Sequence, residues 1–254
     1  MSKHTALDTF GRSGNPAFGD KFEKDAEFSD LPLDQKMTLD GAVNKTGLLL
    51  AICFATAIYS WNFPSPVLIG IGFIGGFIAA LVTIFKPEIA PTSAPIYAAL
   101  EGLALGAISV VFENQYPGIV IQAIGLTFGI LASLLIAYKT GLIKPTENFK
   151  LGLFAATGGI FLVYMVSFIM SFFGSGLSIM NPGNSSLISI GFSLFVVIIA
   201  SLNLVLDFDF IEEASEIGAP KYMEWYGVFG LLVTLIWLYL EILRLLAKLN
   251  SRRS

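Results

Sequence analysis

Residues 203–216 read Asn203-Leu-Val-Leu-Asp207-Phe-Asp209-Phe-Ile-Glu212-Glu213-Ala-Ser-Glu216. The run begins inside a long apolar segment and ends in a cluster of acids. Asp207 stands where a hydrocarbon environment should give way to water. A second acid, Glu241, lies inside the next apolar segment, in Leu-Tyr-Leu-Glu-Ile-Leu-Arg. Because a carboxylate in or beside a membrane costs free energy and usually has a function, these acids predict a proton-sensitive element in a multi-helix membrane protein.

Composition places the chain among integral membrane proteins. Of its 254 residues, 55% are hydrophobic and only 13% are charged, whereas a soluble domain carries about 25% charged residues. Mean hydropathy is +0.75, and apolar residues fall in blocks of about 20, the length that a helix needs to cross a bilayer. A lipid bilayer is therefore the first partner that the sequence implies.

The rarer residue types argue against several function classes. The net charge of −4 gives no support for binding nucleic acid. The single cysteine, Cys53, cannot form an internal disulfide, and core packing explains its place in an apolar block. The single histidine, His4, lies in a polar region, so no metal site of the His/Cys type is expected. We expect no cofactor, and any calcium would be a transported ion.

Seven apolar blocks follow a polar N-terminal region. We expect residues 1–44 to form a mostly disordered polar tail, and residues 45–250 to form a transmembrane domain. Pro, Gly and Asn clusters separate the blocks. The blocks cover residues 46–62, 66–85, 92–112, 117–138, 150–173, 187–206 and 226–246. The predicted fold is thus an all-α bundle of seven transmembrane helices.

Small residues recur every four positions in the first three blocks. Such stripes let helix backbones approach closely in lipid, where no hydrophobic force holds helices together. We therefore expect tight helix packing along all three stripes. The stripes are Gly47, Ala51 and Ala55; Gly72, Gly76 and Ala80; and Ala98, Gly102 and Gly106.

Lysine and arginine residues predict the orientation. They gather in the tail and in the loops on its side of the membrane, while the other loops carry none. The positive-inside rule then makes the N-terminus cytoplasmic. Seven crossings would place Lys248, Arg252 and Arg253 outside, in conflict with that rule. Two arrangements stay open. In the first, the last segment is re-entrant and the C-terminus is cytoplasmic. In the second, which we prefer, the chain crosses seven times and the early loops set the topology.

Other polar residues in or near the blocks are candidates for the ion pathway or the gate. Asn203 lies one turn before Asp207 on the same helical face. Glu101, near the middle of the third block, would be either protonated or paired with a cation, and both a pore-facing role and a neutral hydrogen bond are open. Lys86 directly follows the last apolar residue of the second block, on the same side of the membrane as Asp207. It could be a latch that pairs with the Asp207 carboxylate, or an ordinary membrane anchor.

The acids also have structural interpretations. Asp207 could be a helix-end residue in contact with water. Glu241 could pair with Arg244, three residues further along the same helical face. A solvated acidic loop would explain Asp209, Glu212, Glu213 and Glu216.

At residues 206–211 (Leu-Asp-Phe-Asp-Phe-Ile) and 238–243 (Leu-Tyr-Leu-Glu-Ile-Leu), the chain resembles the Bax inhibitor-1 family. Residues 37–45 (Met-Thr-Leu-Asp-Gly-Ala-Val-Asn-Lys) and 219–226 (Ala-Pro-Lys-Tyr-Met-Glu-Trp-Tyr) are typical of its bacterial branch with a long polar tail. The resemblance covers residues 37–250. It implies seven helices with the last one central, in the inner membrane of a bacterium.

The resemblance also implies a pH-sensitive calcium leak. In the family, an acid on the sixth helix shares protons with an acid on the seventh, and a basic residue near the second helix latches the first acid. Asp207 matches the first acid, and Glu241 matches the second, with Glu where Asp is usual. Lys86 matches the basic residue by position only, where the family has Arg. The predicted pH sensor and gate are Asp207, Glu241, Asp209 and Lys86, and the predicted ion pathway adds Glu101 and Asn203.

The resulting mechanism rests on two carboxylates, Asp207 and Glu241, held close together. Because both cannot ionise cheaply, they would share a proton. Protonation would weaken the latch to Lys86 and let calcium or another cation pass. The alternative is a regulator that transports nothing and binds other membrane proteins, or a membrane protease, through residues 1–44 and 207–216. An enzyme is not expected, because the chain lacks the Gly-x-Gly-Asp sequence of intramembrane aspartyl proteases.

Overall fold

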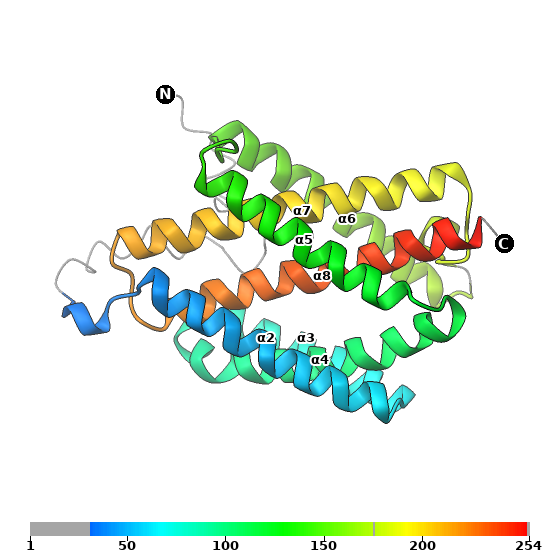
Figure 1. The fold of residues 1–254 in the computed structure, drawn as a ribbon, viewed down its shortest axis with the longest axis horizontal. Helices are drawn as coiled ribbons and strands as arrows, with labels where there is room; N and C mark the ends of the chain where they lie inside the picture. The colour runs from blue at the N-terminus through cyan, green and yellow to red at the C-terminus, as the bar shows by residue number, and fades with distance from the viewer. Residues whose placement is uncertain (1–30, 175, 253–254) are drawn as a thin grey trace. The chain divides into compact units, whose positions relative to one another are not determined.

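The computed structural model describes residues 31–174 and 176–252, which are mainly helical (Figure 1). Most of the predicted tail, residues 1–30, lies outside the described residues. In the described part of the chain, seven helices are long and apolar enough to cross a membrane, which confirms the predicted all-α fold. The α-helices are α2 (Leu39–Asn62), α3 (Pro66–Phe85), α4 (Ala90–Gln115), α5 (Ile119–Lys139), α6 (Glu147–Ser171), α7 (Leu187–Glu216) and α8 (Met223–Ser251). The 3-10 helices are η3 (Leu33–Gln35), η4 (Pro87–Ile89) and η5 (Ser178–Met180).

Side-chain caps set the N-terminal ends of three helices. Thr38, Ser65 and Thr146 precede α2, α3 and α6, and each side-chain oxygen accepts a hydrogen bond from a backbone N–H of the first turn. This satisfies one of the donors that a helix start leaves unpaired. Pro66 follows Ser65 at the first position of α3, where the missing N–H costs nothing.

The end of α7 differs from the sequence prediction. The helix continues through Glu216, so the expected acidic loop over residues 207–216 is wrong. Glu and Ala favour helix, and α7 stops only before Gly218, whose φ of 69° is a conformation that suits glycine. The polar composition marks the end of the apolar segment, not the end of the helix. The last turns of α7 carry Asp209, Glu212, Glu213 and Glu216.

The chain packs as two compact units. The described residues of Met1–Val111 and Asp207–Val233 form the first unit, with α2, α3, most of α4, the end of α7 and the start of α8. Those of Phe112–Leu206 and Thr234–Ser254 form the second unit, with α5, α6 and the remaining parts of α7 and α8. In its most apolar window, α8 is 72% buried, against 17% for α2, α3 and α6. This agrees with the central place that the family resemblance implies for the last helix.

In the first unit, α4 packs closely against α2 and α3 through small residues. A Cβ atom added at Gly102 would collide with the Thr56 hydroxyl and the Cys53 carbonyl oxygen of α2. A Cβ atom added at Gly72 of α3 would lie 2.6 Å from the Cβ atom of Ala104. The predicted stripes of the second and third blocks therefore lie at helix contacts.

The stripe predicted for the first block is wrong. Gly47, Ala51 and Ala55 are exposed on α2, and a Cβ atom added at Gly47 would meet nothing within 4 Å. A four-residue spacing defines a helix face but does not say what that face meets. The buried face of α2 instead carries Leu49 and Cys53.

The second unit has an apolar core between α6 and α7. Partly buried residues pack against it, including Trp237 of α8 and Tyr164 of α6. This packing sets the positions of the polar side chains described below. The core residues are Leu153, Ile160, Val196, Ile199 and Leu206.

Candidate functional site

The two acids of the predicted pair are both buried. Asp207 of α7 is 0% exposed and belongs to the first unit, and Glu241 of α8 is 1% exposed and belongs to the second. Each carboxylate therefore lies inside a compact unit rather than in a loop. The direct contact between them stays a prediction.

Glu241 is the centre of a three-residue cluster in the second unit. The Tyr164 hydroxyl of α6 and the Arg244 guanidinium of α8 both donate to Oε1 of Glu241. Arg244 also donates to the Tyr164 oxygen at 3.3 Å, and its guanidinium lies 5.6 Å from the centre of the Tyr164 ring. The Glu241–Arg244 ion pair considered from the sequence is thus present. Among the described residues, Oε2 of Glu241 has no hydrogen-bond partner, which leaves that oxygen able to accept a proton or a donor.

Asn203 connects α7 to α6 one turn before Asp207. It is 2% exposed, and its amide nitrogen donates to the Thr157 hydroxyl at 3.0 Å and to the Ile199 carbonyl oxygen at 2.9 Å. The first bond crosses between two helices, and the second stays within α7. Asn203 therefore helps to hold in place the part of α7 that precedes Asp207.

Glu101 is buried on α4, with 7% of its surface exposed. A Cβ atom added at Gly76 of α3 would lie 2.5 Å from its Oε1 atom, so the missing side chain makes room for the carboxyl group. Glu101 forms no hydrogen bond or ion pair with another residue that the structure describes. A buried carboxyl group of this kind fits either interpretation made from the sequence.

Lys86 does not pair with Asp207 in this structure. It is exposed in the turn between α3 and η4, and it makes no ion pair with any described residue. Asp207 belongs to the same unit but is fully buried. Asp209, two residues further along α7, is partly buried. The latch and the membrane anchor both stay predictions for Lys86.

Lys248 is a buried residue that the sequence analysis counted as a C-terminal charge. Its ammonium group donates to the Ile179 carbonyl oxygen at 2.6 Å, the Ser193 hydroxyl at 2.8 Å and the Ser189 carbonyl oxygen at 3.2 Å. All three of its N–H donors are used. The available signal was its spacing, because residues seven apart on a helix share a face, and Lys248 follows Glu241 by seven.

A second charged cluster, which we call the Glu224 clasp, comprises Thr38, Lys45, Lys221 and Glu224. Glu224 begins α8 and is fully buried. Its Oε1 atom accepts from the Thr38 N–H at 2.9 Å and the Thr38 hydroxyl at 3.0 Å, and lies 2.8 Å from the Lys221 ammonium. Lys45 of α2 pairs with Oε2. The buried charge is thus fully surrounded by donors.

Backbone contacts reinforce the clasp. The Met37 N–H donates to the Ala219 carbonyl oxygen at 2.6 Å, and the Lys221 N–H donates to the Gln35 carbonyl oxygen at 2.8 Å. The entrance to α2 is therefore attached to the turn between α7 and α8. The two segments singled out as typical of the bacterial branch, residues 37–45 and 219–226, meet here. The sequence showed both segments but not their contact.

The described residues contain no group of three or more His, Cys, Asp or Glu side chains that could hold a metal ion. The buried acids lie on three helices: Glu101 on α4, Asp207 on α7, and Glu224 and Glu241 on α8.

Seven membrane-length helices with buried carboxylates on three of them define a multi-pass membrane protein. The chain matches the family described as Bax inhibitor 1 like over residues 14–251, and it belongs to that family. The match includes all seven helices and both segments of the clasp. No curated protein and no solved structure matches the chain significantly.

Proposed function

We propose that this protein is a pH-sensitive cation leak with calcium as the permeant ion, in the inner membrane of a bacterium and with a cytoplasmic N-terminus. The observation that carries the proposal is the burial of Glu101, Asp207 and Glu241 on three different membrane-length helices. Carboxylates inside spans are costly and typically mark ion or proton pathways. Carboxylate oxygens are also the ligands that calcium prefers.

Asp207 and Glu241 have different roles in this proposal. Glu241 already has a counter-charge in Arg244 and a hydrogen bond from Tyr164. Asp207 would be the acid whose protonation opens the path, by releasing its neighbours in the first unit. Glu101 and Asn203 would contact the passing ion. Because Lys86 is exposed, the gate in this proposal does not need a lysine latch.

Calcium flux into proteoliposomes tests the proposal. We expect flux through the wild-type protein to change between about pH 6 and about pH 8, because a pair of acids that shares a proton would respond to pH as one unit. The Asp207→Asn variant has no carboxyl group at this position, so its flux should lose the part of the pH response that Asp207 provides. Glu216→Gln is the matched control, because Glu216 is exposed on the same helix. It should keep the wild-type profile.

Two results would contradict the proposal. A wild-type pH profile in Asp207→Asn would remove Asp207 from the gate. No calcium flux through correctly folded wild-type protein at any pH would contradict the leak itself. The second result would favour the non-transporting regulator.

A further inference from the structure

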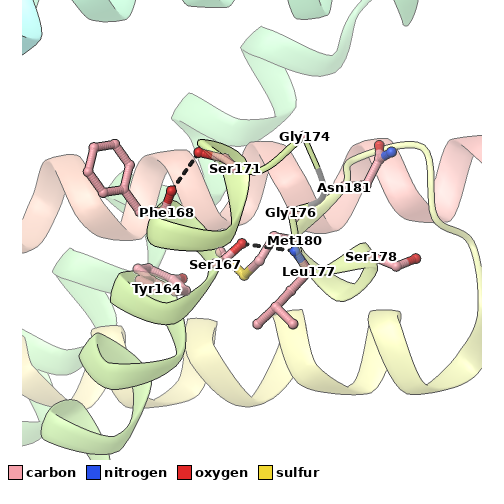
Figure 2. Close-up of a pocket in the computed structure, with 10 residues that line it drawn as sticks. All are labelled: Tyr164, Ser167, Phe168, Ser171, Gly174, Gly176, Leu177, Ser178, Met180 and Asn181. Carbon is pink, nitrogen blue, oxygen red and sulfur yellow. Dashed lines mark hydrogen bonds between the residues drawn. The ribbon is translucent and has the colours of Figure 1, made fainter.

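The second unit contains a pocket of about 690 Å³ at the C-terminal end of α6 (Figure 2). One wall is α6, and the other is the connection to α7 with η5. Its lining combines the polar residues Tyr164, Ser167, Ser171, Ser178 and Asn181 with the apolar residues Phe168, Leu177 and Met180. The Ser167 hydroxyl accepts from the Leu177 N–H, and the Ser171 hydroxyl donates to the Phe168 carbonyl oxygen. No charged side chain lines the pocket.

The polar groups on α6 descend from the helix end into the span. Tyr164, Ser167 and Ser171 follow at spacings of three and four residues, so they share one helix face. Figure 2 shows Ser171 at the end of the helix and Tyr164 deeper along it. Seven residues separate the two, which corresponds to about 10 Å along the axis. Each hydroxyl has one donor and two acceptor positions, so those of Ser167 and Ser171 can still bond to water.

Tyr164, the deepest residue of this row, contacts Glu241. Tyr164 lines the pocket and its hydroxyl donates to the Glu241 carboxylate, so one hydroxyl separates the pocket from that buried acid. The other ionisable groups near Glu241 in the second unit are Arg244 and Lys248 on α8. The α7 part of the unit, residues 187–206, has no ionisable side chain.

The chemistry of the lining identifies what the pocket holds. A lining of uncharged polar and apolar residues offers neither the carboxylates that concentrate calcium nor the basic groups that bind anions. Water fits, because it needs polar partners and about 30 Å³ per molecule. Nearby water would also reduce the large cost of burying the Glu241–Arg244 pair in a membrane.

We propose that this pocket is a water-filled vestibule through which protons reach Glu241, with Tyr164 as the last relay. A hydrated proton bonds to the Tyr164 oxygen while the Tyr164 hydroxyl proton moves to the Glu241 carboxylate. One O–H bond forms on tyrosine as another breaks, and one proton is transferred. This rests on the proposed function, in which Asp207 is the acid that opens the path, and adds Glu241 as the acid that takes up a proton from the vestibule. It adds the route and the face of entry, which is the face of the α6–α7 connection.

Cysteine labelling tests the vestibule without measuring transport. Cys53 is the chain's only cysteine, so Cys53→Ser provides a background without thiols. In that background, Ser167→Cys and Ser171→Cys should react with a membrane-impermeant methanethiosulfonate reagent added from the vestibule face. Ser133→Cys is the matched control, because Ser133 is an exposed serine within the α5 span. It should react at least about tenfold more slowly, since thiolates form in water and not in lipid.

Equal, slow labelling of Ser167→Cys and Ser133→Cys would overturn the vestibule. The relay is tested separately with Tyr164→Phe, which keeps the ring and removes the hydroxyl. In proteoliposomes, calcium flux through this variant should lose its response to pH on the vestibule face and keep its response to pH on the opposite face. A wild-type response in Tyr164→Phe would overturn the relay. Labelling of Ser167→Cys in a protein that carries no calcium would leave the vestibule standing and contradict the proposed function alone.

Discussion

At the scale of single residues, Glu224 shows what a buried carboxylate requires. Both of its oxygens have partners, with Thr38 and Lys221 at one oxygen and Lys45 at the other. Removing one partner of such a cluster leaves a charge without compensation and typically costs about 3–5 kcal/mol. The Glu224 clasp is therefore stable only if α2 can come very close to α8, and Gly41 makes that approach possible.

Gly41→Ala should break this approach. A Cβ atom added at Gly41 would collide with the Glu224 carboxyl group. We expect a loss of about 1–3 kcal/mol from overpacking, measured by thermal unfolding in detergent. Gly47→Ala is the control on the same helix, because nothing lies within 4 Å of its added Cβ atom. It should be neutral or stabilising, since alanine favours helix over glycine by about 1 kcal/mol. Equal effects of the two changes would contradict the close contact.

The sequence alone indicated some of the contacts that the buried carboxylates make. The three-residue spacing of Glu241 and Arg244 was enough to suggest their ion pair as one interpretation of Glu241, because a helix alone brings such residues together. The contact of Tyr164 with Glu241 joins residues 77 positions apart. That contact depends on the packing of α6 against α8, and helix packing cannot be predicted from the spacing of residues within one helix. Glu224 was missed for the same reason, since its partners Thr38 and Lys45 lie on another helix.

At the scale of helices, hydropathy predicted the apolar boundaries and missed the polar ones. The predicted block at 66–85 coincides with α3, and α7 begins at residue 187 as expected. However, α2 begins at Leu39, before the predicted block at 46, and α7 continues through Glu216. Both extensions are helical turns in which polar and apolar residues are mixed. Hydropathy cannot separate such turns from loops, whereas caps such as Thr38 and the helix stop at Gly218 can.

Lys248 is the residue on which the end of α8 depends. Lys248→Met keeps the length of the side chain but leaves the Ile179 and Ser189 carbonyl oxygens without their donor. Because each buried polar group left unsatisfied costs about 1–3 kcal/mol, we expect the variant to unfold at lower temperature. Amide hydrogen exchange should also accelerate in the connection between α6 and α7.

The control for this change is Lys139→Met. Lys139 ends α5 and is exposed, so the same change of charge and shape should leave exchange and unfolding temperature unaltered. Unchanged exchange around Ile179 in Lys248→Met would show that the lysine does not hold the connection.

At the scale of the whole molecule, exposed apolar surface determines the environment. The helices α3, α5 and α6 combine high hydropathy with low burial: only 17% to 22% of their most apolar windows is buried. Soluble proteins rarely expose apolar patches of more than a few hundred Å². These faces therefore need lipid or detergent, while α8, with 72% burial, needs protein neighbours.

The course of α8 decides which side of the membrane the C-terminus reaches. It is one unbroken helix of 29 residues, about 43 Å long, which exceeds the roughly 30 Å of a hydrocarbon core. Lys248, near its end, contacts Ile179 in the connection that precedes α7. Lys248 is thus inside the protein and is not a loop charge for the positive-inside rule. This favours seven full crossings over a re-entrant last segment.

Labelling of single cysteines in the Cys53→Ser background checks this topology in oriented membrane vesicles. Since α6 crosses the membrane and α8 ends beside its C-terminal connection, Asn184→Cys and Ser251→Cys should react with an impermeant maleimide from the same side. Lys144→Cys, in the connection before α6, should react only from the other side. If Ser251→Cys and Lys144→Cys were both labelled from the same side, α8 would have to turn back within the membrane. The contact of Lys248 with Ile179 would then not exist in the bilayer, because that contact requires α8 to reach the opposite face.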